Sequence, residues 1–108
     1  YCDKLTKRTL KENKYMFKVK ENQSCPKKYY KGALFIDPGK EFHYYRQDSN
    51  KYWSHKLGHK DPTIYDSNKK KIKNPRLSKR TWKKVKYPKF CNYFCVPLDN
   101  RKNKHKSL

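Results

Sequence analysis

The sequence predicts an α+β domain with a short N-terminal helix and an antiparallel sheet of about four to five strands. Its 108 residues are enough for one domain. Apolar residues at helical spacing near the start are followed by short aromatic-rich segments between turn signals. We expect one domain over residues 1–98, with a basic loop at 67–89, and a disordered basic tail over 99–108.

Aromatic residues supply most of the predicted core. Only 33% of the residues are hydrophobic, but the chain has ten Tyr, five Phe and two Trp. Each aromatic side chain buries a large area, so these residues can fill a small core. We assign Trp53 and Trp82 to that core. The tyrosines interleaved with lysines are also typical of surfaces that stack nucleic-acid bases, and this second interpretation stays open.

The first half of the chain contains the clearest elements. Residues 5–14 read as a helix with Asp3 as a possible N-cap. Residues 29–37 read as a strand, and the continuous apolar run 33–36 predicts that both its faces are covered. Asp37-Pro38-Gly39-Lys40 is a strong turn signal.

A hairpin follows, with strands at 42–47 and 52–57 around a turn at 48–51. An even loop would place His43 opposite Lys56 and point His43 and His55 to opposite faces. An odd loop would bring the two imidazoles onto one face.

The second half is less regular. Residues 63–66 read as a short strand, 67–75 as a polar basic loop and 90–97 as a final strand. Residues 77–86 have no clear pattern, and Trp82 is expected to hold them against the core.

Charge is the strongest functional signal. The chain has 30 Lys and Arg against 9 Asp and Glu, a net charge of +21. No acid occurs from Ser67 to Leu98, a span that holds the candidate polyanion-binding residues Lys69, Lys70, Lys71, Lys73, Arg76, Lys79, Arg80, Lys83, Lys84, Lys86 and Lys89. Such a field attracts polyanions. We expect nucleic acid to bind with low sequence specificity, because the chain has few of the arginines that read guanine.

Other interpretations of the charge remain open. The lysines can form a solvated surface, contact an acidic protein, or neutralise nucleic acid packed in a virion-type structural protein. We expect an intracellular protein, in a host cytoplasm or a virus particle, although secretion stays possible. No apolar run is long enough to predict a transmembrane segment. The sequon Asn22-Gln23-Ser24 is weak evidence for secretion, since such tripeptides arise by chance.

A family resemblance runs through most of residues 25–97. It is carried by Cys25-Pro26, by 29–39 and 42–48, by the Trp-Ser-His-Lys motif at 53–56 and by the closing segment 90–95. These segments resemble a poorly characterised family of bacteria and large DNA viruses. Their arrangement is similar to the second half of papain-like, NlpC-type cysteine hydrolases. The resemblance implies a papain-like half-fold in which His43 matches the family's histidine.

Hydrolase chemistry would need a cysteine at a helix N-terminus beside an imidazole. Cys2 precedes the predicted helix, so the candidate catalytic residues are Cys2, His43 and His55. The nucleophile could instead lie upstream of Tyr1, or the domain could have kept the fold and lost the chemistry. We expect no enzymatic activity from this chain alone; a cysteine amidase or peptidase is the alternative.

We expect no cofactor and no metal. His55 with His59, and Cys91 with Cys95, are weak candidate ligand pairs without the spacing of a common zinc ribbon. On one regular strand Cys91 and Cys95 would lie about 13 Å apart, too far to bridge. We expect reduced, buried cysteines, with a bridge from Cys2 or Cys25 only in a secreted protein.

Overall fold

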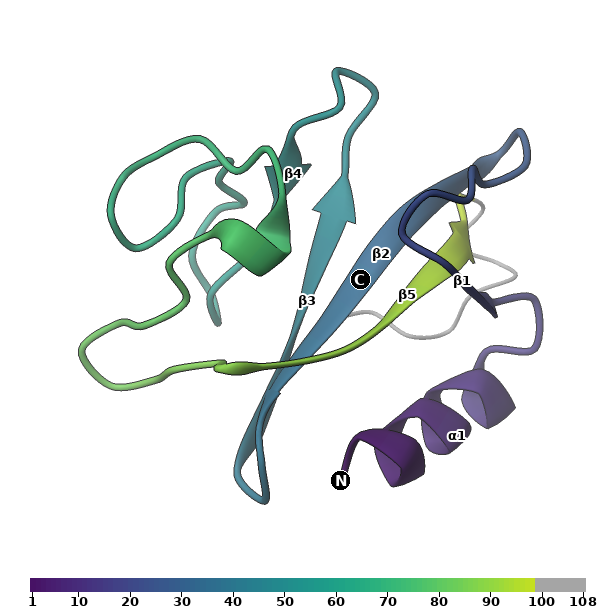
Figure 1. Cartoon of the computed structure of the whole chain (residues 1–108), viewed down its shortest axis with the longest axis horizontal. Helices are drawn as coiled ribbons and strands as arrows, with labels where there is room; N and C mark the ends of the chain where they lie inside the picture. The colour runs from purple at the N-terminus through teal and green to yellow at the C-terminus, as the bar shows by residue number, and fades with distance from the viewer. Residues whose placement is uncertain (99–108) are drawn as a thin grey trace.

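A computed structural model describes residues 1–98, and the predicted tail at 99–108 lies outside them. The elements are α1 (Cys2–Glu12), β1 (Phe17–Val19), β2 (Tyr29–Asp37), β3 (Glu41–Gln47), β4 (Trp53–Ser54), the 3-10 helix η1 (Pro75–Leu77) and β5 (Lys89–Pro97). The strands form one antiparallel sheet in the order β1-β5-β2-β3-β4 (Figure 1). The predicted α+β class is confirmed at this level, while the papain-like half-fold stays a prediction.

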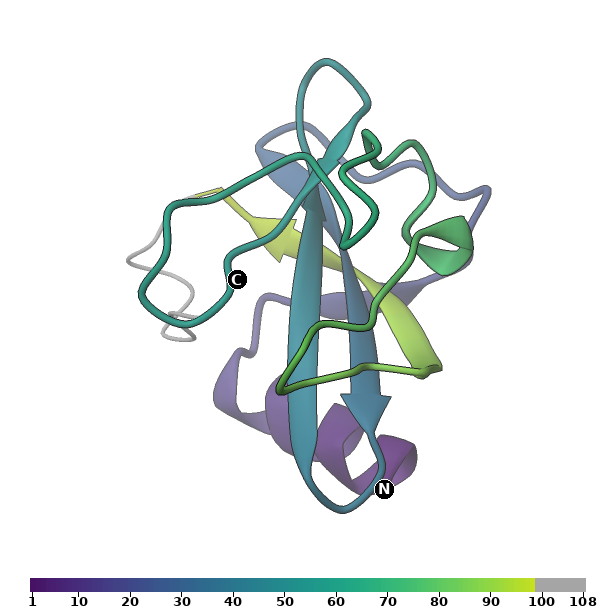
Figure 2. The ribbon, with the colours of Figure 1, turned by 90° about the vertical axis from the view of Figure 1, so that its left-hand side faces the viewer.

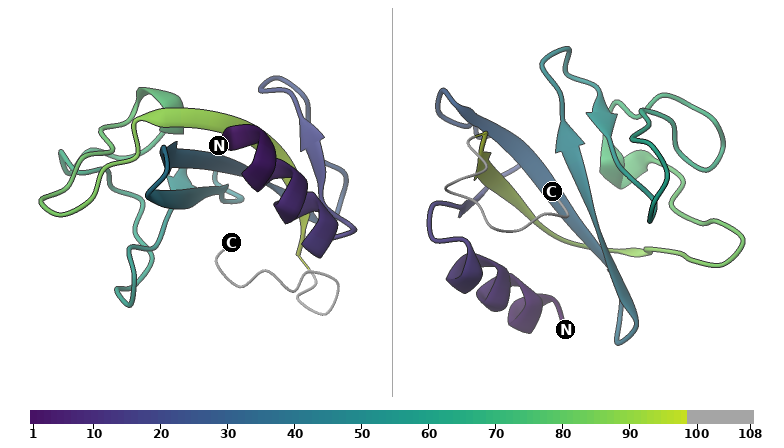
Figure 3. Two further views of the ribbon diagram at one scale, coloured as in Figure 1. Left: turned by 90° about the horizontal axis from the view of Figure 1, so that it is seen from below. Right: turned by 180° about the vertical axis from the view of Figure 1, so that it is seen from behind.

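The centre of the sheet is buried on both faces, as the apolar run in β2 predicts. Ala33 and Phe35 pack into one cluster with Tyr45, Trp53 and Tyr93. The second cluster lies on the other face, where α1 packs, and consists of Met16, Leu34, Tyr44, Phe94 and Val96. Figures 2 and 3 show the twisted sheet with α1 and the long irregular segment at different ends. Six of these ten core residues are aromatic, which explains how so polar a chain folds.

The helix is held to the sheet by polar contacts as much as by apolar ones. α1 starts three residues earlier than predicted, and no side chain caps its first turn, where Asp3 lies. Its buried residues are threonines. Thr9 Oγ1 lies 3.0 Å from the Tyr44 hydroxyl, and the Asn92 amide donates to Thr6 Oγ1 over 2.6 Å. Buried hydroxyls need such partners, so these bonds fix where the helix sits.

A β-bulge in β5 determines which face its cysteines reach. Leu34 pairs with Asn92 and Phe35 with Phe90, so Cys91 is an extra residue in the ladder. A bulge places two successive side chains on one side. Cys91 therefore points with Asn92 toward α1, whereas an unbroken alternation would have pointed it away from the helix.

All four cysteines are oxidised, which corrects the expectation of reduced thiols. Cys2 is bonded to Cys91 and Cys25 to Cys95, with Cα–Cα distances of 5.4 and 5.5 Å. The first bridge joins α1 to β5, and the second joins the β1–β2 connection to the same strand. Both bridges end on β5, the strand between β1 and β2. The disulfides therefore cross-link a domain with little apolar area at the centre of its sheet.

Two other predicted elements differ from the structure. The strand expected at 52–57 is reduced to Trp53–Ser54, and 63–66 forms isolated bridges instead of a strand. The reason is that His55 leaves the ladder and exchanges two main-chain bonds with Thr63, of 3.0 and 2.9 Å. The edge strand β1 was missed, because only three residues pair there and two of them are exposed.

Each disulfide should contribute separately to stability. Loop closure over 89 and 70 residues has an ideal entropic value of about 4.5 kcal/mol, and native disulfides typically contribute somewhat less, so we expect the C2A/C91A and C25A/C95A variants each to lose about 2–4 kcal/mol of unfolding free energy. Urea denaturation measures the loss, and mass spectrometry of a non-reduced digest identifies the bridges. A Cys2–Cys25 or Cys91–Cys95 peptide would contradict the fold.

Candidate functional site

Two histidines from the β3–β4 hairpin meet on one face of the sheet. Arg46 pairs with Ser54 and Gln47 with Trp53, so the connection has five residues and the odd register is the one of the two alternatives that forms. Asn50 Oδ1 accepts from the Tyr52 main chain and helps to shape the longer turn. As a result, His43 Nε2 lies 2.9 Å from His55 Nδ1.

The hydrogen bonds assign the tautomer of each ring. His55 Nε2 lies 2.9 Å from the Tyr65 carbonyl oxygen, which can only accept, so this nitrogen carries the proton. In a neutral ring His55 Nδ1 must then accept, and His43 Nε2–H donates to it. His43 Nδ1 is then the unprotonated nitrogen of its ring, and its lone pair takes no part in the bond between the two imidazoles.

Burial keeps the two rings neutral. It lowers the pKa of His43 to about 3, with a further contribution from His55. Burial also lowers the pKa of His55, opposed by its bond to the Tyr65 carbonyl. The rings lie in an aromatic cluster: His43 stacks on Tyr87 at 4.5 Å and His55 on Tyr45 at 4.7 Å. A general base working near neutral pH needs a much higher pKa.

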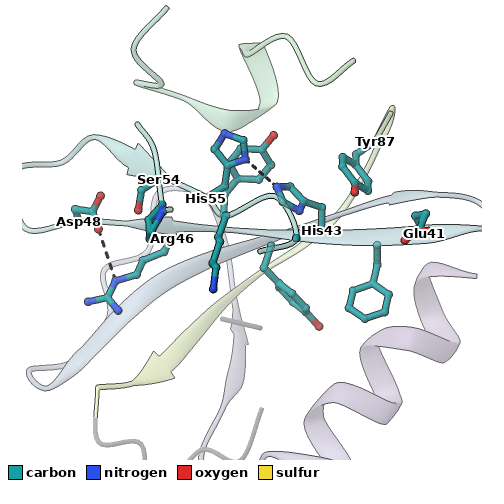
Figure 4. Close-up of a pocket in the computed structure, with 13 residues that line it drawn as sticks. Glu41, His43, Arg46, Asp48, Ser54, His55 and Tyr87 are labelled. Atoms are coloured by element: carbon teal, nitrogen blue, oxygen red, sulfur yellow. Dashed lines mark hydrogen bonds and ion pairs between the residues drawn. The ribbon is translucent and has the colours of Figure 1, made fainter. Parts of the chain in front are cut away.

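A cavity of about 600 Å³ borders this pair (Figure 4). It runs along β3, and its other polar lining includes Glu41, Ser54 and the ion pair of Arg46 with Asp48, whose atoms lie 3.6 Å apart. The lining mixes both charge signs and contains none of the four cysteines. The cavity therefore offers a place for a small polar molecule but no thiol nucleophile.

The expected Cys2–His43 pair does not form. Cys2 is bonded to Cys91, and Cys91 packs in the cluster under α1. The imidazole of His43 stacks with Tyr87 on the other face of the sheet. Cys2 thus has neither a free thiol nor access to an imidazole, and of the three candidate catalytic residues only His43 and His55 come together.

The side chains of the two weak candidate pairs of metal ligands do not lie together either. His59 lies exposed in the turn after Leu57, and the two cysteines of the other pair are in separate disulfides. Within residues 1–98 no group of three His, Cys, Asp or Glu side chains is placed to hold a metal ion.

The basic segment at 69–89 displays most of its charge to solvent. Nine of its eleven candidate residues are exposed lysines, namely Lys69, Lys70, Lys71, Lys73, Lys79, Lys83, Lys84, Lys86 and Lys89. Residues 1–98 contain three ion pairs, and none of them includes these lysines. None of these nine ammonium groups is therefore held in an ion pair, although Asp37 and Glu41 line one hollow with Lys83, Lys84 and Lys86.

The two arginines of the segment have structural contacts. Arg80 donates to the Pro75 carbonyl over 2.6 Å and to the Tyr87 carbonyl over 2.9 Å, and its guanidinium lies 4.3 Å from the Phe35 ring. Arg76 pairs with Glu21 at 3.3 Å. The only feature of the sequence that distinguishes these two residues from the lysines is the residue type, because the planar guanidinium can donate several hydrogen bonds within the fold.

Asp66 organises the start of the segment. Its carboxylate accepts main-chain bonds from Asn68, Lys70 and Lys79 over 2.8, 3.0 and 3.1 Å. Burial alone would raise its pKa, but the three N–H donors hold that pKa below its usual range. An Asp before a polar run is a common turn signal, yet its bond to Lys79 depends on the tertiary fold. The lysines are thus displayed on an ordered scaffold.

Protonation of His43 should destabilise the fold. Its pKa is 6.5 in a free ring and about 3 in the folded protein, so the unfolded state binds more protons between these values. The contribution of neutral His43 to the free energy of unfolding is complete above pH 6.5, and it decreases as the pH falls toward 3. We expect roughly 2–4 kcal/mol less unfolding free energy at pH 4 than at pH 7, measured by urea denaturation.

His43→Gln should reduce this pH dependence, while the exposed His59→Gln should keep it. The slope between pH 6.5 and 5 is the readout, because carboxylates contribute mainly below that range. Equal slopes in both variants would show that His43 is not the buried neutral base.

No helix within residues 1–98 is long and apolar enough to cross a membrane. No protein-family model matches the chain, and no solved structure matches it. A stretch of 26 residues is 58% identical to "Insoluble matrix shell protein 1" of Ruditapes philippinarum. This match covers 24% of the chain and 18% of that protein, so it is a short local similarity.

Proposed function

We propose that this chain is a non-enzymatic, disulfide-stapled basic domain that binds a polyanion through the lysines of residues 69–89. The observation that carries the proposal is the set of nine exposed lysines without ion-pair partners within residues 1–98. A cluster of this density attracts a charged polymer over several ångströms and holds it at several points. Because Asp66 and Arg80 order the segment, less conformational entropy is lost on binding.

The oxidised cysteines favour an extracellular polyanion. Two disulfides are typical of proteins made for oxidising compartments. The name of the Ruditapes philippinarum protein that is similar over 26 residues, "Insoluble matrix shell protein 1", favours a similar setting. In that setting the abundant charged polymers are sulfated or carboxylated polysaccharides, and we propose these as the ligand class. Nucleic acid is the second candidate, favoured by the charge alone.

The histidine site supports the non-enzymatic part of the proposal. The two imidazoles hydrogen-bond to each other and to a main-chain carbonyl, and burial holds both pKa values below the usual range. With every cysteine in a disulfide, the chain has no thiol for cysteine-hydrolase chemistry. We therefore assign His43 and His55 to the core of the domain.

Binding should be electrostatic and steeply dependent on salt. Lysine ammonium groups act as point charges and release counterions from the polymer, so log K should fall linearly with log salt. Isothermal titration with heparin, hyaluronate and duplex DNA between 50 and 300 mM NaCl measures this slope. We expect heparin to bind most tightly, because its charge density is the highest of the polysaccharides used.

A pair of charge-matched variants locates the site. K83Q/K84Q/K86Q removes three charges from the segment, and K4Q/K7Q/K11Q removes three exposed charges from α1. We expect about a tenfold loss of heparin affinity in the first variant and less than about threefold in the second. Equal losses would mean that only net charge matters, and a flat salt response would contradict the proposal. Tighter binding of DNA than of heparin would favour the second candidate.

A further inference from the structure

The β1–β2 connection presents the sequon Asn22-Gln23-Ser24 in a tight, exposed turn. The Gln23 main-chain N–H donates to the Lys20 carbonyl over 3.1 Å, which closes a turn with Asn22 at its third position. The Gln23 side chain reaches back and accepts from the Lys20 N–H over 3.0 Å. All three residues of the sequon are exposed, and the side chain of the middle residue is held by the main chain of the turn.

Glu21 anchors this turn to the body of the domain. Its carboxylate accepts from the Tyr93 hydroxyl over 3.0 Å and from Arg76 over 3.3 Å. Its carbonyl oxygen accepts from Lys31 Nζ over 2.7 Å. Asn22, the next residue in the turn, is exposed. Within residues 1–98, the side chains of Asn22 and Ser24 make no hydrogen bond, so the amide and the hydroxyl are free to react.

The disulfides give this sequon a meaning that the sequence alone does not. A chain that acquires Cys2–Cys91 and Cys25–Cys95 bridges folds in an oxidising compartment. In eukaryotic cells, that compartment is also where Asn-x-Ser/Thr sequons receive N-linked glycans on surface loops. The printed sequence contains one such tripeptide, and it lies in an exposed turn instead of a strand or the core.

We propose that Asn22 is an N-glycosylation site. In the reaction, Asn22 Nδ2 forms a bond to the anomeric carbon of an oligosaccharide carried on a lipid diphosphate. The bond between that carbon and the diphosphate oxygen breaks, the lipid diphosphate leaves, and Nδ2 loses one proton to a base. The acceptor position needs no rearrangement of the sheet, because Asn22 lies in the exposed β1–β2 connection and outside the strands.

The test is to express the full chain behind a cleavable signal sequence in eukaryotic cells and to measure its intact mass. We expect a glycan-sized increment that peptide-N-glycosidase removes, with conversion of Asn22 to Asp. N22Q and S24A should abolish the increment, and S24T should keep it. N68Q, in another exposed turn without a sequon, is the matched control and should leave it unchanged.

A wild-type chain with both disulfides formed and the mass of the bare polypeptide would overturn the proposal. If secretion itself fails, the same mass measurement is made on chain translated into microsomes, where an unmodified mass is equally contradictory. The result is independent of polyanion binding, which is measured on unglycosylated protein. Each proposal can therefore fail without the other.

Discussion

The rest of the structure depends on how β5 is anchored. This strand lies between β1 and β2, and its bulge points Cys91 toward α1 while Cys95 points to the opposite side. One strand thereby fixes both the helix and the β1–β2 connection through covalent bonds. A chain with so much positive charge repels itself, and covalent anchors at the centre of the sheet offset that repulsion.

The anchored sheet leaves the long segment between β4 and β5 free to carry function. Few regular hydrogen-bond ladders hold that segment, and single contacts made by Asp66 and Arg80 take their place. Acidic and arginine side chains thus serve the scaffold, while lysines face solvent. The division explains how the chain carries so much charge without disrupting its aromatic core.

Sequence alone predicted the parts of the fold that local patterns determine. The buried run 33–36 and the turn after it follow from residue type and spacing. The histidine pair and the Cys2–Cys91 disulfide do not, because each depends on a shift of one residue in strand register. The bulge at Cys91 and the five-residue connection before Trp53 both reverse the direction of a side chain, and neither has a sequence signal.

The central claim is that the exposed lysines, and not the cavity at His43, form the binding surface. The most direct measurement is a titration of ¹⁵N-labelled protein with a short heparin fragment, followed by amide and lysine side-chain shifts. We expect saturable shifts concentrated in residues 69–89, with His43 and His55 unchanged. Shifts centred on the histidine cavity, with residues 69–89 unaffected, would contradict it.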